Sequence, residues 1–208
     1  MIPALDALER LRDGNRRFVS GARASGASLT GTRRAELATS QEPFAIILGC
    51  ADSRVPAEIV FDQGLGDLFV IRVAGNIVAP SLVGSVEFAA ERFGTRLVVV
   101  LGHTQCGAIN ATIDELQQPN ARQSRNLRAI VDRVRPAVSG LFQTDLARDR
   151  RALVAAAVRA NIRASADHLR HASEILEQLI RDGGLVVVGA EYSLETGEVD
   201  FFDGIPEP

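Results

Sequence analysis

The sequence predicts an α/β fold with a mostly parallel central sheet, flanking helices and an N-terminal helical arm. Four short runs rich in valine, isoleucine and leucine are continuously apolar rather than alternating, which is typical of strands covered on both faces. Helical patterns separate these runs, which favours crossover connections between parallel strands. The predicted strands are Phe44–Leu48, Leu68–Val73, Leu97–Leu101 and Leu185–Val188.

A fifth strand is predicted near the C-terminus, at Glu198–Phe202. It follows a turn around Gly197 and is more polar than the other four, so we place it at an edge of the sheet. The predicted sheet therefore has four parallel strands plus an antiparallel or edge fifth.

The helices are predicted from apolar periodicity and from proline and glycine at their ends. The first 18 residues alternate charge and leucine like an amphipathic helix. Pro56 can start a helix after the first strand, and Pro80 opens one that Gly94 closes. Three later helices are predicted at Gln105–Leu116, at Asn126–Val134 before Pro136, and at Ala147–Arg181 before Gly183.

We expect one domain with four parts. Residues 1–40 form the N-terminal arm, which includes a linker-like stretch at 21–31, and residues 41–115 form the core. A helical region follows at 116–182, and the chain returns to the sheet at 183–208. Because a helix beside a linker has little core of its own, the arm is expected to pack on a second subunit.

Composition excludes several classes of function. The net charge is −3 and all 23 basic residues are arginine, so no basic excess indicates a nucleic-acid binder. The absence of lysine excludes the phosphate-binding P-loop and Schiff-base chemistry. No apolar run approaches the roughly 20 residues that span a bilayer. Two cysteines and no signal-peptide pattern favour a cytoplasmic protein without a disulfide framework.

Chemically reactive side chains follow two of the predicted strands. Cys50, Asp52 and Arg54 come directly after the first strand, and His103 and Cys106 come directly after the third. Ligands of open parallel sheets bind beyond the carboxyl ends of the strands. If these two strands are neighbours, two thiols, an imidazole and a carboxylate meet at one point.

Two thiolates and one imidazole form a good zinc site. Cys50, His103 and Cys106 would supply three ligands and leave the fourth tetrahedral position open, as in catalytic rather than structural zinc sites. A water in that position has its pKa lowered from ~15.7 to about 7, which makes hydroxide available at neutral pH.

Asp52 has two competing partners. Its carboxylate can pair with the planar guanidinium of Arg54, or it can become the fourth zinc ligand and close the site. This arrangement suggests the hypothesis of a pH-dependent on/off site. The residues alone also leave open two buried apolar cysteines, a catalytic thiol with His103 as its base, and a redox pair. His168 and His171, spaced i, i+3 on the long predicted helix, are interpreted as part of a solvated face.

Three segments resemble the β-class carbonic anhydrases. CADSRVPAEIVFDQGLGDLFVIRVAGN and VVVLGHTQCGAINA resemble the two signatures of that family, and GAEYSLETGEV resembles its closing segment. The resemblance implies one zinc ion per subunit on Cys50, His103 and Cys106, with Asp52 and Arg54 as a gating dyad. It also implies a dimer, often a dimer of dimers, with the active site at the subunit interface.

The resemblance further assigns substrate contacts. Gln41 matches a bicarbonate contact, the backbone amide of Gly107 matches a substrate-contacting position, and Arg72 matches an anion contact of some members. The apolar CO₂ pocket is matched by Phe69, Ala74 and Phe88.

The implied reaction is the reversible hydration of CO₂ to bicarbonate and a proton by a zinc-bound hydroxide. One alternative is hydrolysis of CS₂ or COS on the same scaffold. The other is a non-catalytic zinc or thiol module, against which the intact pair of Asp52 and Arg54 speaks, since a structural site has no use for a displaceable ligand.

Overall fold

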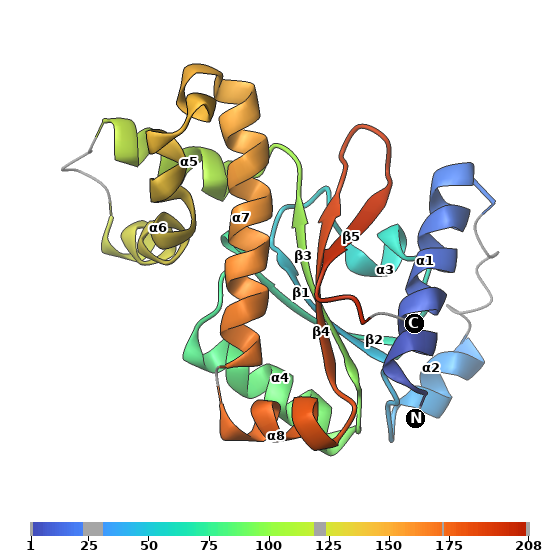
Figure 1. The fold of residues 1–208 in the computed structure, drawn as a ribbon. Coiled ribbons are helices and arrows are strands. Elements are labelled where there is room, and N and C mark those ends of the chain that lie inside the picture. Colours follow the sequence, from blue (N-terminus) through green and yellow to red (C-terminus); the bar gives the residue numbers. More distant parts are fainter. Residues whose placement is uncertain (1, 23–30, 119–123, 172, 207–208) are drawn as a thin grey trace.

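A computed structural model describes residues 2–22, 31–118, 124–171 and 173–206. Its centre is one five-stranded sheet with the order β2-β1-β3-β4-β5 (Figure 1). The first four strands are parallel, and β5 is antiparallel to β4, so the predicted fold class is confirmed. The strands are β1 Ala45–Cys50, β2 Leu68–Val73, β3 Leu97–His103, β4 Val186–Tyr192 and β5 Val199–Asp203.

The pairing of β1 with β3 positions the candidate ligands. In this parallel register Gly49 lies beside Leu101, one residue before Cys50 and two residues before His103. Both chemically reactive residues are the last of their strands, and both strands are buried along their whole length. The carboxyl ends of two central strands thus carry a thiol and an imidazole to the same edge of the sheet.

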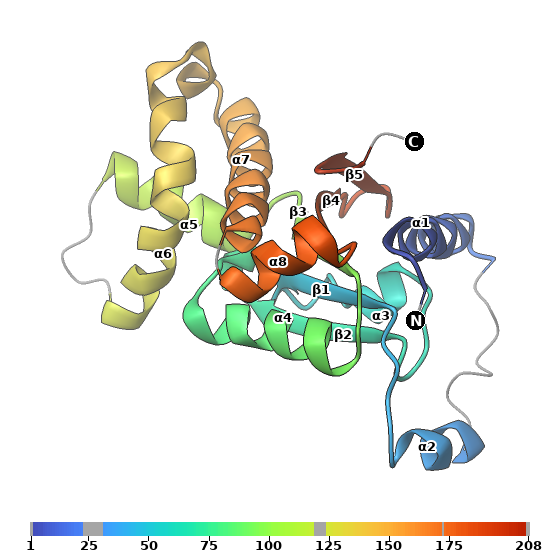
Figure 2. The same ribbon diagram turned by 60° about the horizontal axis from the view of Figure 1, so that its bottom comes forward.

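Helices cover both faces of the sheet (Figures 1 and 2). On one face α4 and α7 pack on the strands, and α5 and α6 pack against α7. On the other face lie α1 and α3, while α2 is peripheral. The helices are α1 Ala4–Ser20, α2 Gly31–Leu37, α3 Ala57–Val60, α4 Pro80–Arg92, α5 Gly107–Gln117, α6 Arg125–Val138, α7 Arg150–Arg170 and α8 Glu174–Asp182, and the 3₁₀ turns are η2 Ala74–Asn76, η3 Ser139–Gln143 and η4 Asp145–Arg148.

The long helix predicted at Ala147–Arg181 is wrong, because two helices occupy this range. Asp149 caps α7 by accepting hydrogen bonds from the N–H groups of Arg151 and Ala152. The Ser173 side chain then accepts one from Leu176 and starts α8. Capping side chains satisfy N–H groups that have no partner inside the helix, so each one allows a new start.

Two further expectations need correction, and a third falls mostly on residues that are not described. Pro136 does not end its helix, since α6 continues to Val138; the proline ring only removes one N–H from the helix interior. Strand β2 is half-buried rather than covered on both faces, because it ends the sheet on one side. Most of the stretch at 21–31 predicted to be a linker lies outside the described residues, and α2 begins at Gly31.

The N-terminal helix has a core of its own, contrary to the premise that it lacks one. Leu8 and Leu11 are buried against the sheet. The Asn15 side chain donates to the carbonyls of Val60 and Gly197, at 3.1 and 2.9 Å, and its oxygen accepts the N–H of Val199. This buried amide fixes α1 to α3 and to the start of β5.

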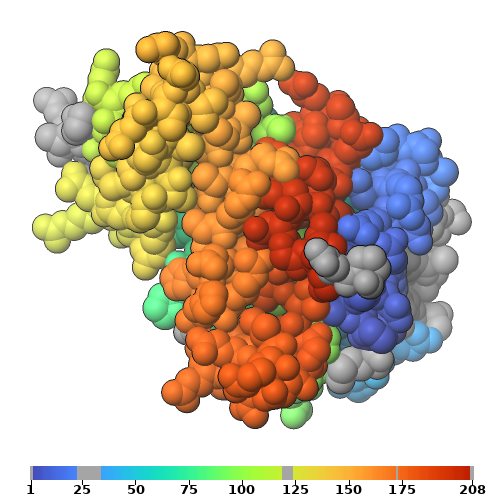
Figure 3. Space-filling model, in the orientation of Figure 1, coloured from blue at the N-terminus to red at the C-terminus, as the bar shows by residue number. Residues whose placement is uncertain are grey.

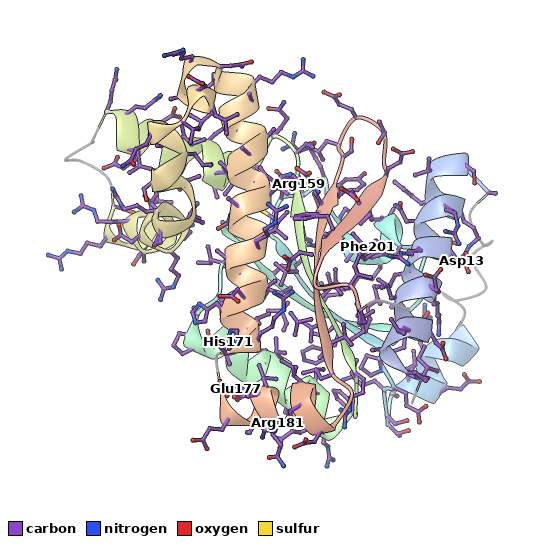
Figure 4. The ribbon with its side chains drawn as sticks, viewed as in Figure 1. Asp13, Arg159, His171, Glu177, Arg181 and Phe201 are labelled. Carbon is purple, nitrogen blue, oxygen red and sulfur yellow. The ribbon has the colours of Figure 1, made fainter. Side chains whose placement is uncertain are left out.

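Arginines attach α7 to the last two strands. Arg159 lies on α7 (Figure 4). Its guanidinium is 3.0 Å from a Glu191 carboxylate oxygen, 2.8 Å from one of Asp200, and over the ring of Phe202. In the space-filling view, the chain around β5 fills the surface between α7 and α1 (Figure 3).

His168 and His171 are exposed, which confirms the solvated face predicted for them. Among the described residues, no helix is long and apolar enough to cross a bilayer.

Substitution of Gly14 tests how closely α1 packs against the residues that follow α3. A Cβ atom there would overlap the backbone carbonyl of Phe61 and lie 2.8 Å from Nε2 of Gln63. We expect Gly14→Ala to lower the free energy of unfolding by about 1–3 kcal/mol, measured by urea denaturation. Gly140→Ala is the control, because a Cβ there meets nothing within 4 Å; we expect a change within about 0.5 kcal/mol. Equal effects of the two substitutions would contradict this packing.

Candidate metal centre

Three ligand atoms converge at the carboxyl ends of β1 and β3. Cys50 ends β1, His103 ends β3, and Cys106 is the residue that caps α5. Their ligand atoms lie within 4.8 Å of one another, and the two sulfur atoms are 4.0 Å apart. All three side chains are buried. The convergence predicted from the two loops is therefore present.

The nitrogen of His103 that faces this cluster has no partner. Nδ1 lies 2.8 Å from the carbonyl oxygen of Thr104, which makes Nδ1 the protonated nitrogen and leaves the lone pair on Nε2. Nε2 is buried and makes no hydrogen bond to any described residue. A tetrahedral ion with Zn–S bonds of ~2.3 Å requires two sulfurs roughly 3.8 Å apart, close to the spacing seen. These residues fit a zinc ion.

The two thiols are electrostatically different. The hydrogen bond with Cys106 is the main cause that lowers the pKa of Cys50 to about 4, against the opposing effect of burial. The same hydrogen bond raises the pKa of Cys106, and burial adds to that rise. A cysteine binds metal as the thiolate, which is the form that a lowered pKa favours at Cys50.

Burial alone would lower the pKa of His103, but the nearby Cys50 sulfur and the Thr104 carbonyl outweigh it and raise that pKa. The pKa of the imidazole therefore depends on the Cys50 sulfur beside it.

Thr104 fixes the loop between the ligands His103 and Cys106. Its N–H donates to the carbonyl of Tyr192 at 3.0 Å, and its hydroxyl accepts the N–H of Leu194 at 3.0 Å. Its own carbonyl orients the His103 ring. Such outer contacts set the direction of a ligand. A partner of this kind is expected for any ligating histidine, but the sequence could not identify which residue supplies it.

Asp52 is held by Arg54. Two guanidinium nitrogens lie 2.9 and 2.7 Å from the two carboxylate oxygens, and the N–H of Arg54 donates to one of them at 3.0 Å. These hydrogen bonds lower the pKa of the Asp52 carboxyl. Its Oδ2 remains 3.7 Å from Nε2 of His103. Arg72 supports the same loop, since its guanidinium donates to the backbone carbonyls of Cys50 and Asp52.

The substrate residues implied by resemblance fall into two groups. Ala74 and Gly107 lie beside the ligands: Ala74 precedes Gly75, whose N–H donates to the Cys50 sulfur, and Gly107 follows Cys106 at the start of α5.

Gln41, Phe69 and Phe88 lie elsewhere in the same chain. Phe69 pairs with Ile46, four residues before Cys50, which is roughly 13 Å along the strand. Phe88 is 53% exposed, and its ring centroid is 6.2 Å from that of Phe69. Gln41 precedes β1 and lines a surface cavity with Phe93, which also contacts Phe69 and Phe88. One chain does not bring these three residues to the metal centre.

Comparison with known proteins identifies the family of the chain. A family model described as carbonic anhydrase matches residues 45–199. Carbonic anhydrase 2 of Mycobacterium tuberculosis is 38% identical over 204 residues, which cover 96% of this chain and 93% of that protein.

Solved structures have the same fold. The β-carbonic anhydrase CcaA superposes with a TM-score of 0.70 at 26% identity and covers 98% of this chain and 93% of its own. A structure described among two tetrameric β-carbonic anhydrases from Sordaria macrospora gives 0.74 at 21% identity, covering 95% and 97%. On the family model, the identity to this relative and the shared fold, the chain belongs to the β-carbonic anhydrase family.

Proposed function

We propose that this protein is a zinc-dependent carbonic anhydrase that catalyses the reversible hydration of CO₂ to bicarbonate and a proton. One zinc ion would be held by Cys50, His103 and Cys106. The observation that carries the proposal is the buried, partnerless Nε2 of His103 facing two thiols. An uncompensated buried polar atom is costly, and a metal ion removes that cost.

When bound, zinc supplies Lewis-acid activation of a water molecule at neutral pH. The chain's own residues would prepare the rest of the site. Arg54 holds both carboxylate oxygens of Asp52, which keeps this carboxylate from acting as a fourth ligand. The N–H of Gly107, in the first turn of α5, would bind an oxygen of bicarbonate, because N–H groups at a helix start have no partner inside the helix.

A second copy of the chain would complete the substrate pocket. The exposed Phe88 forms an apolar cluster with the half-buried Phe69 and Phe93 at β2 and α4, and β2 ends the sheet on that side. Exposed aromatic clusters of this kind mark interaction surfaces. We infer that Gln41, Phe69 and Phe88 serve the metal centre of a partner subunit. The tetrameric relatives from Sordaria macrospora support self-association of this type.

No feature of the described site favours CS₂ or COS over CO₂, and the matched relatives are named carbonic anhydrases. The pairing of Asp52 with Arg54 also argues against a non-catalytic zinc module, because a purely structural site gains nothing from a carboxylate held beside it.

Substitution of His103 tests the metal centre, with His168 as the control histidine. We expect His103→Ala to lose stoichiometric zinc and CO₂ hydration, since only two ligands remain. His168→Ala should keep both, because His168 is an exposed residue of α7. Zinc content by mass spectrometry and stopped-flow CO₂ hydration measure the two effects, with circular dichroism to confirm folding. Full zinc and activity in a folded His103→Ala variant would refute the assignment.

Subunit complementation tests the shared pocket. One chain carries His103→Ala, and the other carries Gln41→Ala together with Phe88→Ala; each alone should have little activity. Two different affinity tags allow the mixed dimer to be purified. Its one intact site should give about half the wild-type turnover per dimer, because a two-fold dimer has two equivalent sites. If these residues serve their own chain, the mixed dimer stays as inactive as its parents.

A further inference from the structure

The turn that follows β2 places a hydrogen-bond donor on a metal ligand. In η2, Gly75 has φ 74° and Asn76 has φ 43°, so two consecutive residues are left-handed. This backbone aims the N–H of Gly75 at the Cys50 sulfur, 3.4 Å away. A Cβ on residue 75 would lie 3.0 Å from the Cβ of Ala108 and would strain the backbone at this φ. Glycine is therefore required here, and it is also the residue with the most freedom to rotate.

A side chain from a distant helix anchors this glycine. Nδ2 of Asn161, in the middle of α7, donates to the carbonyl oxygen of Gly75 at 2.8 Å across 86 residues of sequence. Asn161 is 2% exposed and sits between the buried residues Val158 and Ile162. A buried amide is costly unless it is hydrogen-bonded, and among the described residues its NH₂ group bonds only to this turn.

The two bonds act on opposite sides of the Gly75 Cα. Asn161 holds the carbonyl and so restrains the rotation of the turn, while the N–H on the other side points at the sulfur. An N–H group that donates to a thiolate withdraws electron density from the sulfur. The strength of this bond sets how much charge the sulfur gives to a metal.

We propose that Asn161 is a positioning residue of the metal centre, which acts through Gly75 to keep an N–H bond on the Cys50 thiolate. The proposal rests on the zinc site proposed above. It concerns the electronic state of the ligand, so removal of Asn161 should change the metal–sulfur bond and not only the stability of the fold.

Ser165 provides a matched control. It lies four residues later on α7, is 6% exposed, and lines the same cavity of about 690 Å³ between α4, α6 and α7 that Asn161 lines. Within the described part of the chain, its side chain makes no hydrogen bond to the turn at 74–76.

The test uses cobalt(II) in place of zinc, because the sulfur-to-cobalt charge-transfer band reports the electron density on the thiolates. Wild type, Asn161→Leu, Asn161→Ser and Ser165→Ala are compared by this band and by the rate of zinc loss to a chelator. We expect both Asn161 variants to shift the band to longer wavelength, because the sulfur regains electron density. We also expect them to lose zinc about tenfold faster, because the turn no longer restrains the Cys50 side chain; tenfold is the low end of effects seen for outer-shell groups. Asn161→Ser decides the question if the leucine variant does not fold.

The outcomes separate the two proposals. Ser165→Ala should keep the wild-type band and rate. Asn161 variants that melt at lower temperature but retain the wild-type band would show a structural role and overturn this inference alone. A wild-type protein with no sulfur-to-cobalt band would overturn the metal centre and this inference together.

Discussion

The buried Nε2 of His103 sets the main constraint on this structure. It faces two sulfur atoms at the end of a fully buried strand and has no hydrogen-bond partner. Leaving such an atom unpaired costs free energy, and moving it to solvent would break the pairing of β3 with β1 and β4. A cation between Nε2 and the sulfurs of Cys50 and Cys106 satisfies all three groups at once. The parallel neighbours β1 and β3 make that geometry possible.

Separate parts of the chain hold this cluster in place. The end of β4 fixes Thr104, and Thr104 orients the imidazole. Arg72 on β2 binds the backbone of the Cys50 loop, and Asn161 on α7 binds the turn that contacts the Cys50 sulfur. Arg159 in turn attaches α7 to β4 and β5. The ligands are thus preorganised from both sides of the sheet, which reduces the cost of assembling the site when metal binds.

Much of this arrangement could be predicted from the sequence, for a physical reason. Buried parallel strands appear as continuous apolar runs. Because the carboxyl ends of neighbouring parallel strands lie at the same edge of the sheet, Cys50 and His103 are then expected to lie close together. The break between α7 and α8 was missed because it depends on one capping serine, Ser173. The roles of Asn15 and Asn161 could not be predicted, since each depends on contacts with chain segments far away in sequence. The order of residues in the sequence also does not show whether a residue contributes to the metal centre of its own chain or to that of a partner subunit.

Zinc K-edge X-ray absorption of the purified, reduced protein tests the central claim most directly. The account predicts one zinc per chain bound by two sulfurs at about 2.3 Å and by two nitrogen or oxygen ligands at about 2.0 Å. One of the lighter ligands is the imidazole, and the other occupies the open position. A zinc shell without sulfur, a shell of four sulfurs, or protein purified without zinc would contradict it.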